Sequence, residues 1–175
     1  MKKNEIAIFW FRRDLRLEDN CGLYNALQSG YKVLPIFIFD ETILQHLEKN
    51  DARVTFIHNQ LEKINYELTK TNKSIAVFFG KPIDIFKKLI VENKIETVYT
   101  NQDYEPYARK RDLSLYELFK ANNVKFKTCK DQVIFEKSEI TKDDGLPYVV
   151  YTPFSNKWKA KLKATQLVNY PSETL

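Results

Sequence analysis

Polar and charged residues follow each of five short apolar runs, and these are the residues that could do chemistry. They lie in the segments 12–20, 40–41, 80–81, 101–105 and 129–132. Three of these segments are dense in Arg, Asp, Glu and Asn, so together they could hydrogen-bond a polar, planar ligand from several directions. The alternative is that the arginines and carboxylates pair with each other and fix the shapes of the loops. For any single residue, we give this loop-fixing role at least as much weight as a role in ligand binding.

The elements that must position these loops are predicted by the hydrophobic pattern. Short, unbroken runs rich in β-branched and aromatic residues are typical of strands covered on both faces, as in a parallel sheet. They lie at 6–11, 33–39, 75–79 and 97–100, with an alternating run at 124–127. Between them apolar residues recur at three- and four-residue steps, most clearly within 51–71, which predicts helices. This alternation predicts one α/β domain, a doubly wound, Rossmann-like, five-stranded parallel sheet with helices on both faces. Pro35 cannot donate to a sheet ladder, which leaves the start of the second strand open.

The regular alternation stops after the last of these loops. A turn is predicted at 143–145, and the proline-interrupted stretch 146–154 predicts an extended segment. A lysine-rich segment follows at 156–164, and the residues 170–172 are typical of a linker. We therefore expect a domain cut from a longer protein, with an α/β unit over 1–135 and an extended exit segment with the start of an interdomain linker over 136–175.

Composition narrows the class of protein. With 175 residues, 43% of them hydrophobic and 29% charged, the chain can bury a folded core, which excludes general disorder. No apolar run approaches the ~18 residues that span a bilayer, and the charged start carries no cleavage pattern. We therefore expect a cytoplasmic protein without membrane contact. The net charge of +5 fits contact with a polyanion, but on charge alone we favour a solvated, lysine-rich surface.

Several kinds of site are excluded by missing motifs. The chain has neither G-x-G-x-x-G nor G-x-x-x-x-G-K-[ST], so the usual pyrophosphate-binding loops are absent. Cys21 and Cys129 lack the spacing of metal ligands and are expected to be free thiols, and no metal site is predicted. His58 borders the apolar stripe of the helix within 51–71 and is expected at the edge of the core. His46 lies in a polar loop and is expected in solvent.

The segment 9–20, FWFRRDLRLEDN, carries more information than any periodicity. It resembles the amino-terminal signature W-F-R-x-D-L-R-L-x-D-N of the DNA photolyase and cryptochrome family. Further segments resemble parts of that family in the same order, namely 36–40, 51–53, 101–112 and 148–154 followed by Trp158. The resemblance spans nearly the whole chain and is most specific at 9–20 and 101–112.

This resemblance implies the amino-terminal α/β domain of a deoxyribodipyrimidine photolyase. In that family a larger carboxy-terminal helical domain holds FAD and accepts a flipped pyrimidine dimer, which the flavin splits in light. The parent is therefore expected to be a carbon–carbon lyase that repairs DNA, with its own flavin domain and damaged DNA as partners. This chain shows none of that machinery. Alone, it is expected to be inactive, to lack FAD, and to bind DNA weakly or not at all.

The resemblance further implies that the α/β domain holds an antenna chromophore, which passes excitation energy to the flavin. Members that bind a deazaflavin or a related flavin use the first-strand loop, the end of the second strand and the acidic loop after the fourth. In this sequence the candidates are Arg12, Asp14, Phe37, Asp40, Arg53, Asn101, Asp103 and Glu105. A deazaflavin-type antenna is favoured over methenyltetrahydrofolate, because His46 is displaced along its loop from the histidine of folate-binding members.

Two other functions stay open at this point. A cryptochrome, which senses light without repairing DNA, has the same amino-terminal domain, and the pocket that separates the two classes lies in the other domain. The third hypothesis is a stand-alone small-molecule-binding domain. The exit segment 148–158 argues against it, because a free domain has little need of an interdomain element. The match at 101–112 is closer to bacterial repair enzymes, so we favour photolyase.

Overall fold

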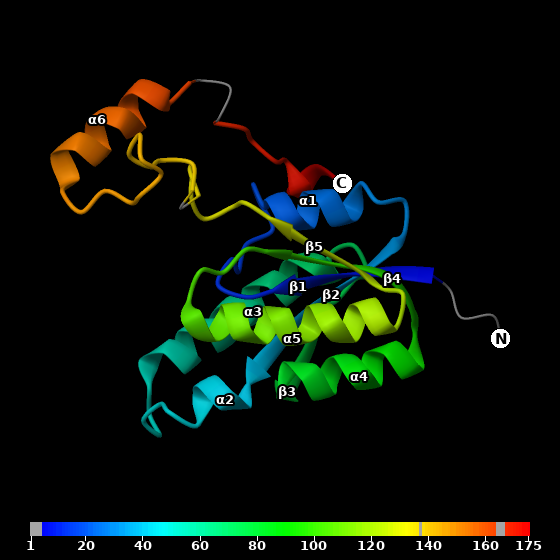
Figure 1. The fold of residues 1–175 in the computed structure, drawn as a ribbon. Helices are drawn as coiled ribbons and strands as arrows, with labels where there is room; N and C mark the ends of the chain where they lie inside the picture. Colours follow the sequence, from blue (N-terminus) through cyan, green and yellow to red (C-terminus); the bar gives the residue numbers. More distant parts are fainter. Residues whose placement is uncertain (1–4, 137, 164–166) are drawn as a thin grey trace.

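The computed structural model describes residues 5–136, 138–163 and 167–175. Its strands are β1 (Glu5–Phe11), β2 (Lys32–Asp40), β3 (Ala76–Gly80), β4 (Lys94–Asn101) and β5 (Lys125–Cys129). They form one five-stranded sheet in the order β3-β2-β1-β4-β5, and every neighbouring pair is parallel (Figure 1). The predicted doubly wound parallel sheet is therefore confirmed.

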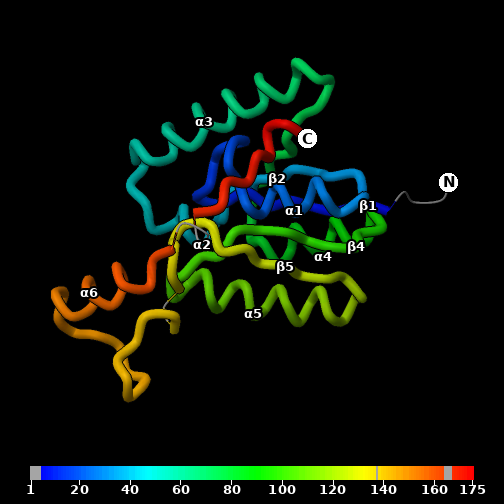
Figure 2. Tube along the Cα trace, turned by 90° about the horizontal axis from the view of Figure 1, so that it is seen from above, coloured from blue at the N-terminus to red at the C-terminus, as the bar shows by residue number. Residues whose placement is uncertain are grey.

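Helices cover both faces of this sheet (Figure 2). On one face lie α1 (Cys21–Leu27) and α3 (Ala52–Thr69), and on the other lie α4 (Pro82–Glu92) and α5 (Pro106–Ala121). The short α2 (Glu41–Leu44) directly follows β2, and α6 (Tyr151–Lys161) projects beyond the layers (Figure 1). Asn20, Asp40 and Asp51 cap α1, α2 and α3 with side-chain oxygens, whereas α4 and α5 begin with a proline. None of the helices in the described part of the chain is long and apolar enough to cross a membrane.

The central strand β1 buries both of its faces. Trp10 points to the α4 and α5 side, where its ring meets Phe86 edge to face at a centroid distance of 5.2 Å. Phe9 and Phe11 point to the α1 and α3 side. Because successive strand residues face opposite sides, a strand covered by helices on both faces must be apolar throughout. This explains the unbroken apolar run and places the polar segment 12–20 at the carboxyl end of β1.

Pro35 lies inside β2, four residues before the end of the apolar run. It is in register with Phe9 of β1, but β2 pairs with β3 only from Ile36 onward. At Pro35, β2 therefore has no neighbouring strand on its β3 side, and proline is tolerated at such an unpaired edge. The second strand begins before this proline, at Lys32.

The extended segment predicted over 146–154 is wrong in its second part, because α6 begins at Tyr151. Pro153 lies in the first turn of α6, where a backbone N–H has no partner within the helix, so proline does not oppose the helix there. Trp158 of α6 meets Phe135 edge to face at a centroid distance of 5.6 Å, so the helix packs against the segment after β5. The lysine-rich segment is thus largely helical, and its last residue, Ala164, lies outside the described residues.

The segment 170–172, predicted to be a linker, docks on the loop before α1, and its role as a linker stays a prediction. Ser172 is buried, its Oγ accepts a hydrogen bond from the Asn20 N–H at 3.1 Å, and it donates to the Leu17 carbonyl at 2.5 Å. The Tyr170 N–H donates to Asp19 Oδ1 at 2.9 Å. These contacts join residues far apart in the sequence, so no local pattern predicts them. The division of the chain near residue 135 stays a prediction.

Candidate functional site

A pocket of about 670 Å³ opens at the carboxyl ends of β1 and β2, and we call it the rim pocket. Its walls come from these strand ends, from the segment between α2 and the start of α3, and from the loop after β4 with the first turns of α5. Doubly wound sheets bind ligands at the carboxyl edge where the strand order reverses, and here the chain reverses at β1 and β4. The pocket also has the size of a small-molecule site.

One wall of the rim pocket is apolar. Its side chains come from β2, from α2 and the loop after it, and from α3, and they are Phe37, Ile38, Phe39, Ile43, Leu44, Leu47, Val54 and Ile57. Phe37 is buried and meets Phe39 edge to face, with ring centroids 5.0 Å apart. A wall of this kind suits the faces of a flat aromatic ring system.

Two arginines line another wall beside Trp10. The guanidinium carbon of Arg12 lies 4.2 Å from the Trp10 ring centroid, and that of Arg111 lies 4.7 Å from it. Arg12 binds both carboxylate oxygens of Asp112 at 2.9 Å, and burial, followed by the charge of Arg111, lowers the pKa of Arg12 to about 10. The Arg111 side chain is only 9% exposed, and its Nη2 finds no hydrogen-bond partner among the described residues. The Nε of Arg12 lacks a partner as well. Buried donors are nearly always paired, so these two nitrogens are exceptions that an acceptor on a ligand could satisfy.

Asp40 and Tyr107 join the end of β2 to α5. The carboxylate of Asp40 is buried, and its Oδ2 accepts a hydrogen bond from the Tyr107 hydroxyl at 2.7 Å. Its Oδ1 accepts from the Thr42 N–H at 3.0 Å, and Arg111 Nη1 lies 3.9 Å from Oδ2. Burial raises the pKa of Tyr107, so the phenol stays protonated and keeps donating to this carboxylate.

Charged groups at the mouth of the pocket are loosely paired. Asp103 Oδ2 lies 3.7 Å from Arg13 Nε, and Glu105 Oε1 lies 3.6 Å from Arg13 Nη2. Arg13 and Glu105 are well exposed, so these ion pairs contribute little and a ligand could replace them. Arg53 at the start of α3 is also exposed, and its hydrogen bonds lower the pKa of Asp51 to about 2.

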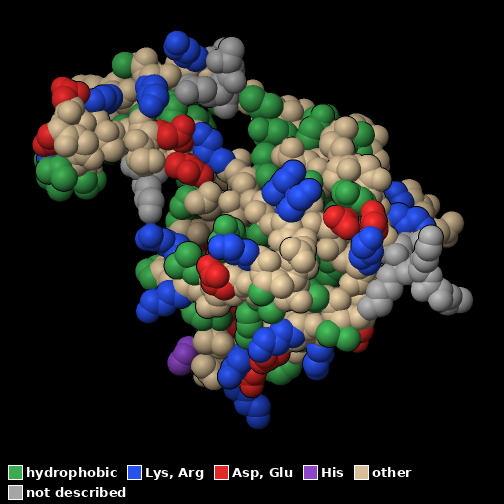
Figure 3. Space-filling view, turned by 45° about the vertical axis from the view of Figure 1, so that its right-hand side comes forward, with side chains coloured by type: hydrophobic (Ala, Val, Ile, Leu, Met, Phe, Trp, Pro, Cys, Tyr) green, Lys and Arg blue, Asp and Glu red, His purple; other side chains and the backbone are tan. Residues whose placement is uncertain are grey.

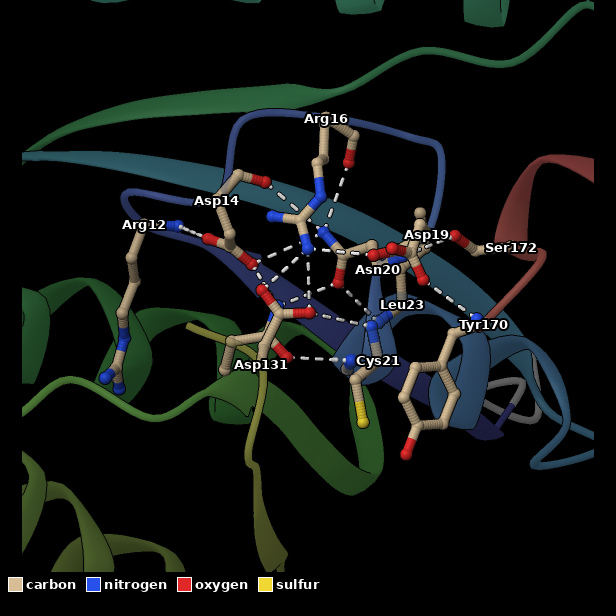
Figure 4. Close-up of polar contacts among 12 residues, drawn as sticks. Arg12, Asp14, Arg16, Asp19, Asn20, Cys21, Leu23, Asp131, Tyr170 and Ser172 are labelled. Atoms are coloured by element: carbon tan, nitrogen blue, oxygen red, sulfur yellow. Dashed lines mark hydrogen bonds and ion pairs between the residues drawn. The ribbon is translucent and has the colours of Figure 1, made fainter. Parts of the chain in front are cut away.

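The structure brings six of the eight candidate residues into the rim pocket, namely Arg12, Phe37, Asp40, Arg53, Asp103 and Glu105. The other two, Asp14 and Asn101, do not line it. With Asn20 they form what we call the closed polar cluster, of which Figure 4 labels Asp14 and Asn20.

Every side chain of the closed polar cluster is buried and hydrogen-bonded. Asn101 Nδ2 donates to Asp14 Oδ2 at 2.5 Å and to Asn20 Oδ1 at 2.8 Å, and Asn101 Oδ1 accepts from the Gly22 N–H at 2.8 Å. Asp14 Oδ1 also accepts from the Arg12 N–H at 2.7 Å. These bonds hold the first loop to β4 and α1, which is the loop-fixing role that the sequence left open.

Sequence reasoning missed Tyr107 and Arg111 as pocket residues. They lie one helical turn apart on α5, and that spacing within the segment 101–112 was the available signal. His46 is exposed, as expected, and also lines the edge of the pocket. The expectation for His58 is wrong, because its side chain is 62% exposed and lies 3.8 Å from Glu62 on the outer surface of α3.

The fold and the rim pocket together define an α/β domain that can hold a small molecule at the carboxyl edge of its sheet. Comparison with known proteins identifies the family. The DNA photolyase family profile matches residues 7–172. The chain is also 32% identical over 166 residues to a deoxyribodipyrimidine photo-lyase of Synechococcus sp., which covers 95% of this chain and 34% of that protein. This chain belongs to the DNA photolyase family.

Solved structures agree with this assignment. A class III photolyase from Agrobacterium tumefaciens superposes with a TM-score of 0.82 at 27% identity, over 98% of this chain and 35% of that one. An archaeal photolyase from Sulfolobus tokodaii, solved with two FAD molecules that imply a novel light-harvesting cofactor, gives 0.73 at 32% identity, over 91% and 36%. The chain thus spans about a third of the length of these relatives, and it matches their amino-terminal part.

Proposed function

We propose that this chain is the antenna-chromophore domain of a deoxyribodipyrimidine photolyase, which splits cyclobutane pyrimidine dimers in light, and that the rim pocket holds the antenna. One observation carries the second part: a buried guanidinium nitrogen of Arg111 lacks a partner in the described structure, next to an apolar wall at the ligand-binding edge of the sheet. Membership of the DNA photolyase family supports the first part.

A deazaflavin-type chromophore fits the residues that line the pocket. The apolar wall around Phe37 would cover the faces of its ring system, and Arg111 would donate to a carbonyl oxygen of the ring. Asp103 and Glu105 would accept hydrogen bonds from ring N–H groups or hydroxyls, and Arg53 would pair with an acidic tail. When bound, such a chromophore supplies excitation energy to the parent's flavin. The residues of this chain bind it, orient it and exclude water from its ring.

Methenyltetrahydrofolate is the less favoured antenna. His46, which stands in the loop that carries a histidine in folate-binding members, is exposed, and its Nε2 lies 3.4 Å from the side-chain nitrogen of its neighbour Gln45. An imidazole in solvent contributes little to binding, because it exchanges one set of polar partners for another. The two FAD molecules of the Sulfolobus relative also favour a flavin-like ring.

We assign the repair chemistry to a longer parent. FAD, electron transfer and recognition of damaged DNA would belong to a carboxy-terminal flavin domain, the partner of this chain. DNA binding by this chain alone should be weak. Lys157 pairs with Asp143 at 2.8 Å, Lys161 donates to the Glu139 carbonyl at 2.6 Å, and acidic side chains lie among the basic ones around α6 (Figure 3). Mixed charge of this kind gives only weak, salt-sensitive attraction to a phosphate backbone.

A cryptochrome is the second candidate for the parent, because cryptochromes are among the relatives of this chain. Antenna binding does not separate the two classes. Repair of thymine dimers under blue light by the full-length protein would support a photolyase, and its absence would favour a cryptochrome. We expect this chain alone to repair none, so light-dependent repair by the isolated chain would contradict the proposal.

Titration of the purified chain with a deazaflavin, FAD and methenyltetrahydrofolate, followed by chromophore fluorescence, tests the binding site. We expect the deazaflavin to bind more tightly than the folate. Arg111→Met should weaken deazaflavin binding about 10- to 100-fold, because it removes a charge-assisted hydrogen bond from a buried position.

Arg109→Met is the matched control. Arg109 is an exposed residue of the same helix, outside the rim pocket, so this change removes the same charge without touching the site. Its affinity should stay within about twofold of the wild type. Tighter binding of the folate, binding of neither ligand, or equal loss in the two variants would overturn the proposal.

A further inference from the structure

The two cysteines of the chain meet on the side of the sheet that carries α1. Cys21 is the first residue of α1, and Cys129 is the last residue of β5. The side-chain nitrogen of Asn25 lies 3.5 Å from the Cys21 sulfur and 3.6 Å from the Cys129 sulfur, so one amide contacts both. The two thiols lie close enough for each to affect the ionisation of the other. Neither residue lines the rim pocket.

The surroundings make these two thiols chemically unequal. The interaction with Cys129 is the largest cause that lowers the pKa of Cys21 to about 7, while burial opposes it. The same interaction raises the pKa of Cys129. Tyr170 also helps to lower the pKa of Cys21, and Figure 4 shows the Cys21 sulfur close to the Tyr170 ring. The charge facing the pair is Asp131, which Arg16 neutralises at 2.8 Å. Cys21 is therefore the sulfur that ionises first.

We propose that Cys21 and Cys129 form a redox-modification site at which a peroxide produces an intramolecular disulfide. The Cys21 thiolate attacks one oxygen of hydrogen peroxide, which forms a sulfenic acid and releases hydroxide. The Cys129 sulfur then attacks the Cys21 sulfur, the S–O bond breaks, and the oxygen leaves as water. Two thiols and one peroxide thus give one disulfide and two waters. Cys21 is only 5% exposed, so a small oxidant such as hydrogen peroxide suits this site better than a bulky one.

The structure also indicates what this oxidation would change. A disulfide would tie the first turn of α1 to the end of β5 and would remove the thiol that neighbours Tyr170. Tyr170 belongs to the segment that docks on the loop before α1, so the docked segment would lose one of its contacts. In a reducing compartment such a pair is transient and acts as a sensor, whereas an oxidising one would hold it closed.

Treatment of the wild-type chain with hydrogen peroxide, followed by mass spectrometry without reductant, tests the site. We expect a loss of about 2 Da, no free thiols, a cross-linked peptide that contains both cysteines, and full reversal by dithiothreitol. Closing so long a loop should also raise the Tm by roughly 5–10 °C. Two free thiols remaining, or disulfide-linked dimers in place of the internal bond, would overturn the proposal.

Single-cysteine variants separate the two roles. In Cys129→Ser, Cys21 should form a sulfenic acid that dimedone traps, with a rate that rises with pH as the Cys21 thiol ionises. In Cys21→Ser, the remaining Cys129 should react much more slowly at the same pH. The opposite order of reactivity would overturn the assignment of Cys21 as the attacking sulfur. Circular dichroism of both variants verifies that they are folded.

Discussion

The rim pocket and the closed polar cluster both lie at the carboxyl end of β1, but their polar side chains are used in opposite ways. In the cluster, both the amide nitrogen and the amide oxygen of Asn101 form hydrogen bonds with other groups of the protein. In the pocket, Arg111 is almost as buried but keeps a nitrogen without a partner in the described structure. The cluster is complete without a ligand, whereas the pocket keeps an unpartnered donor, which the proposed antenna would satisfy.

This difference shows that residue type does not separate a binding residue from a structural one. Asp14 and Asp103 are both carboxylates just after a strand, and both are buried. Asp14 accepts hydrogen bonds from a backbone N–H and from two amide side chains. Asp103 accepts one from the Glu105 N–H at 3.2 Å, and its other oxygen faces an exposed arginine 3.7 Å away. Which donors remain unpaired after folding decides the role, because those are the groups a ligand can satisfy.

Asn101→Leu should break the closed cluster and have the largest effect on stability. It leaves the buried Asp14 carboxylate without its 2.5 Å partner and the Gly22 N–H without an acceptor, which should cost about 3–4 kcal/mol of unfolding free energy. Urea denaturation followed by circular dichroism measures this. Asp103→Asn, a similar polar change on the pocket side, should cost less than about 1 kcal/mol. Equal losses in the two variants would mean that the two regions do not differ as described.

Gly22→Ala tests how tightly the cluster is packed, with a smaller expected effect. A Cβ at this position would lie 2.7 Å from Asn101 Oδ1 and 2.8 Å from Phe9 Cε2. Alanine is the better helix former by about 1 kcal/mol, so without this clash the change would stabilise α1. We expect a net loss of about 1–3 kcal/mol, because the buried neighbours must shift.

Gly145→Ala is the control for this change. A Cβ at Gly145 meets nothing within 4 Å, and only its φ of +82° opposes alanine, which should cost about 1 kcal/mol or less. A Gly22→Ala variant that is as stable as the wild type, or more stable, would show that Asn101 is free to move and that the cluster is not closed.

The sequence was sufficient for the sheet, because a strand covered on both faces must be continuously apolar and a covering helix must carry an apolar stripe. It also placed the loops that meet at the rim pocket, since all carboxyl ends of parallel strands lie at one edge. It could not separate Asn101 from Asp103, because the partners of Asn101 lie 81 and 87 residues away along the chain. The docking of Ser172 could not be predicted from the sequence for the same reason. The helix that begins at Tyr151 was not predicted, because Pro153 indicated an extended chain, although the first turn of a helix tolerates proline.

Tyr104→Phe removes a hydrogen bond of the loop after β4, beside the pocket residue Asp103, and has the smallest expected effect. Tyr104 directly follows Asp103 in the loop after β4, and its hydroxyl donates to Glu136 Oε1 at 3.2 Å. Burial first, then the charge of Glu136, raises the pKa of Tyr104 to about 12 from a normal value of 10.0. The folded state therefore holds this proton more tightly than the unfolded chain does. The stability that Tyr104 contributes is present below pH 10 and is lost as the pH rises toward 12.

At neutral pH the Tyr104→Phe variant should be less stable than the wild type by about 1 kcal/mol or less, the value of one hydrogen bond to a partly exposed group. The gap should shrink between pH 10 and 12, when unfolding is measured in parallel for both proteins so that the other titrating groups cancel. Tyr116→Phe on the outer side of α5, where the side chain is 48% exposed, should show no such window. If the stability difference stays constant across this range, the hydrogen bond to Glu136 does not stabilise the loop after β4. The pocket wall formed by that loop would then be stabilised by the closed polar cluster alone.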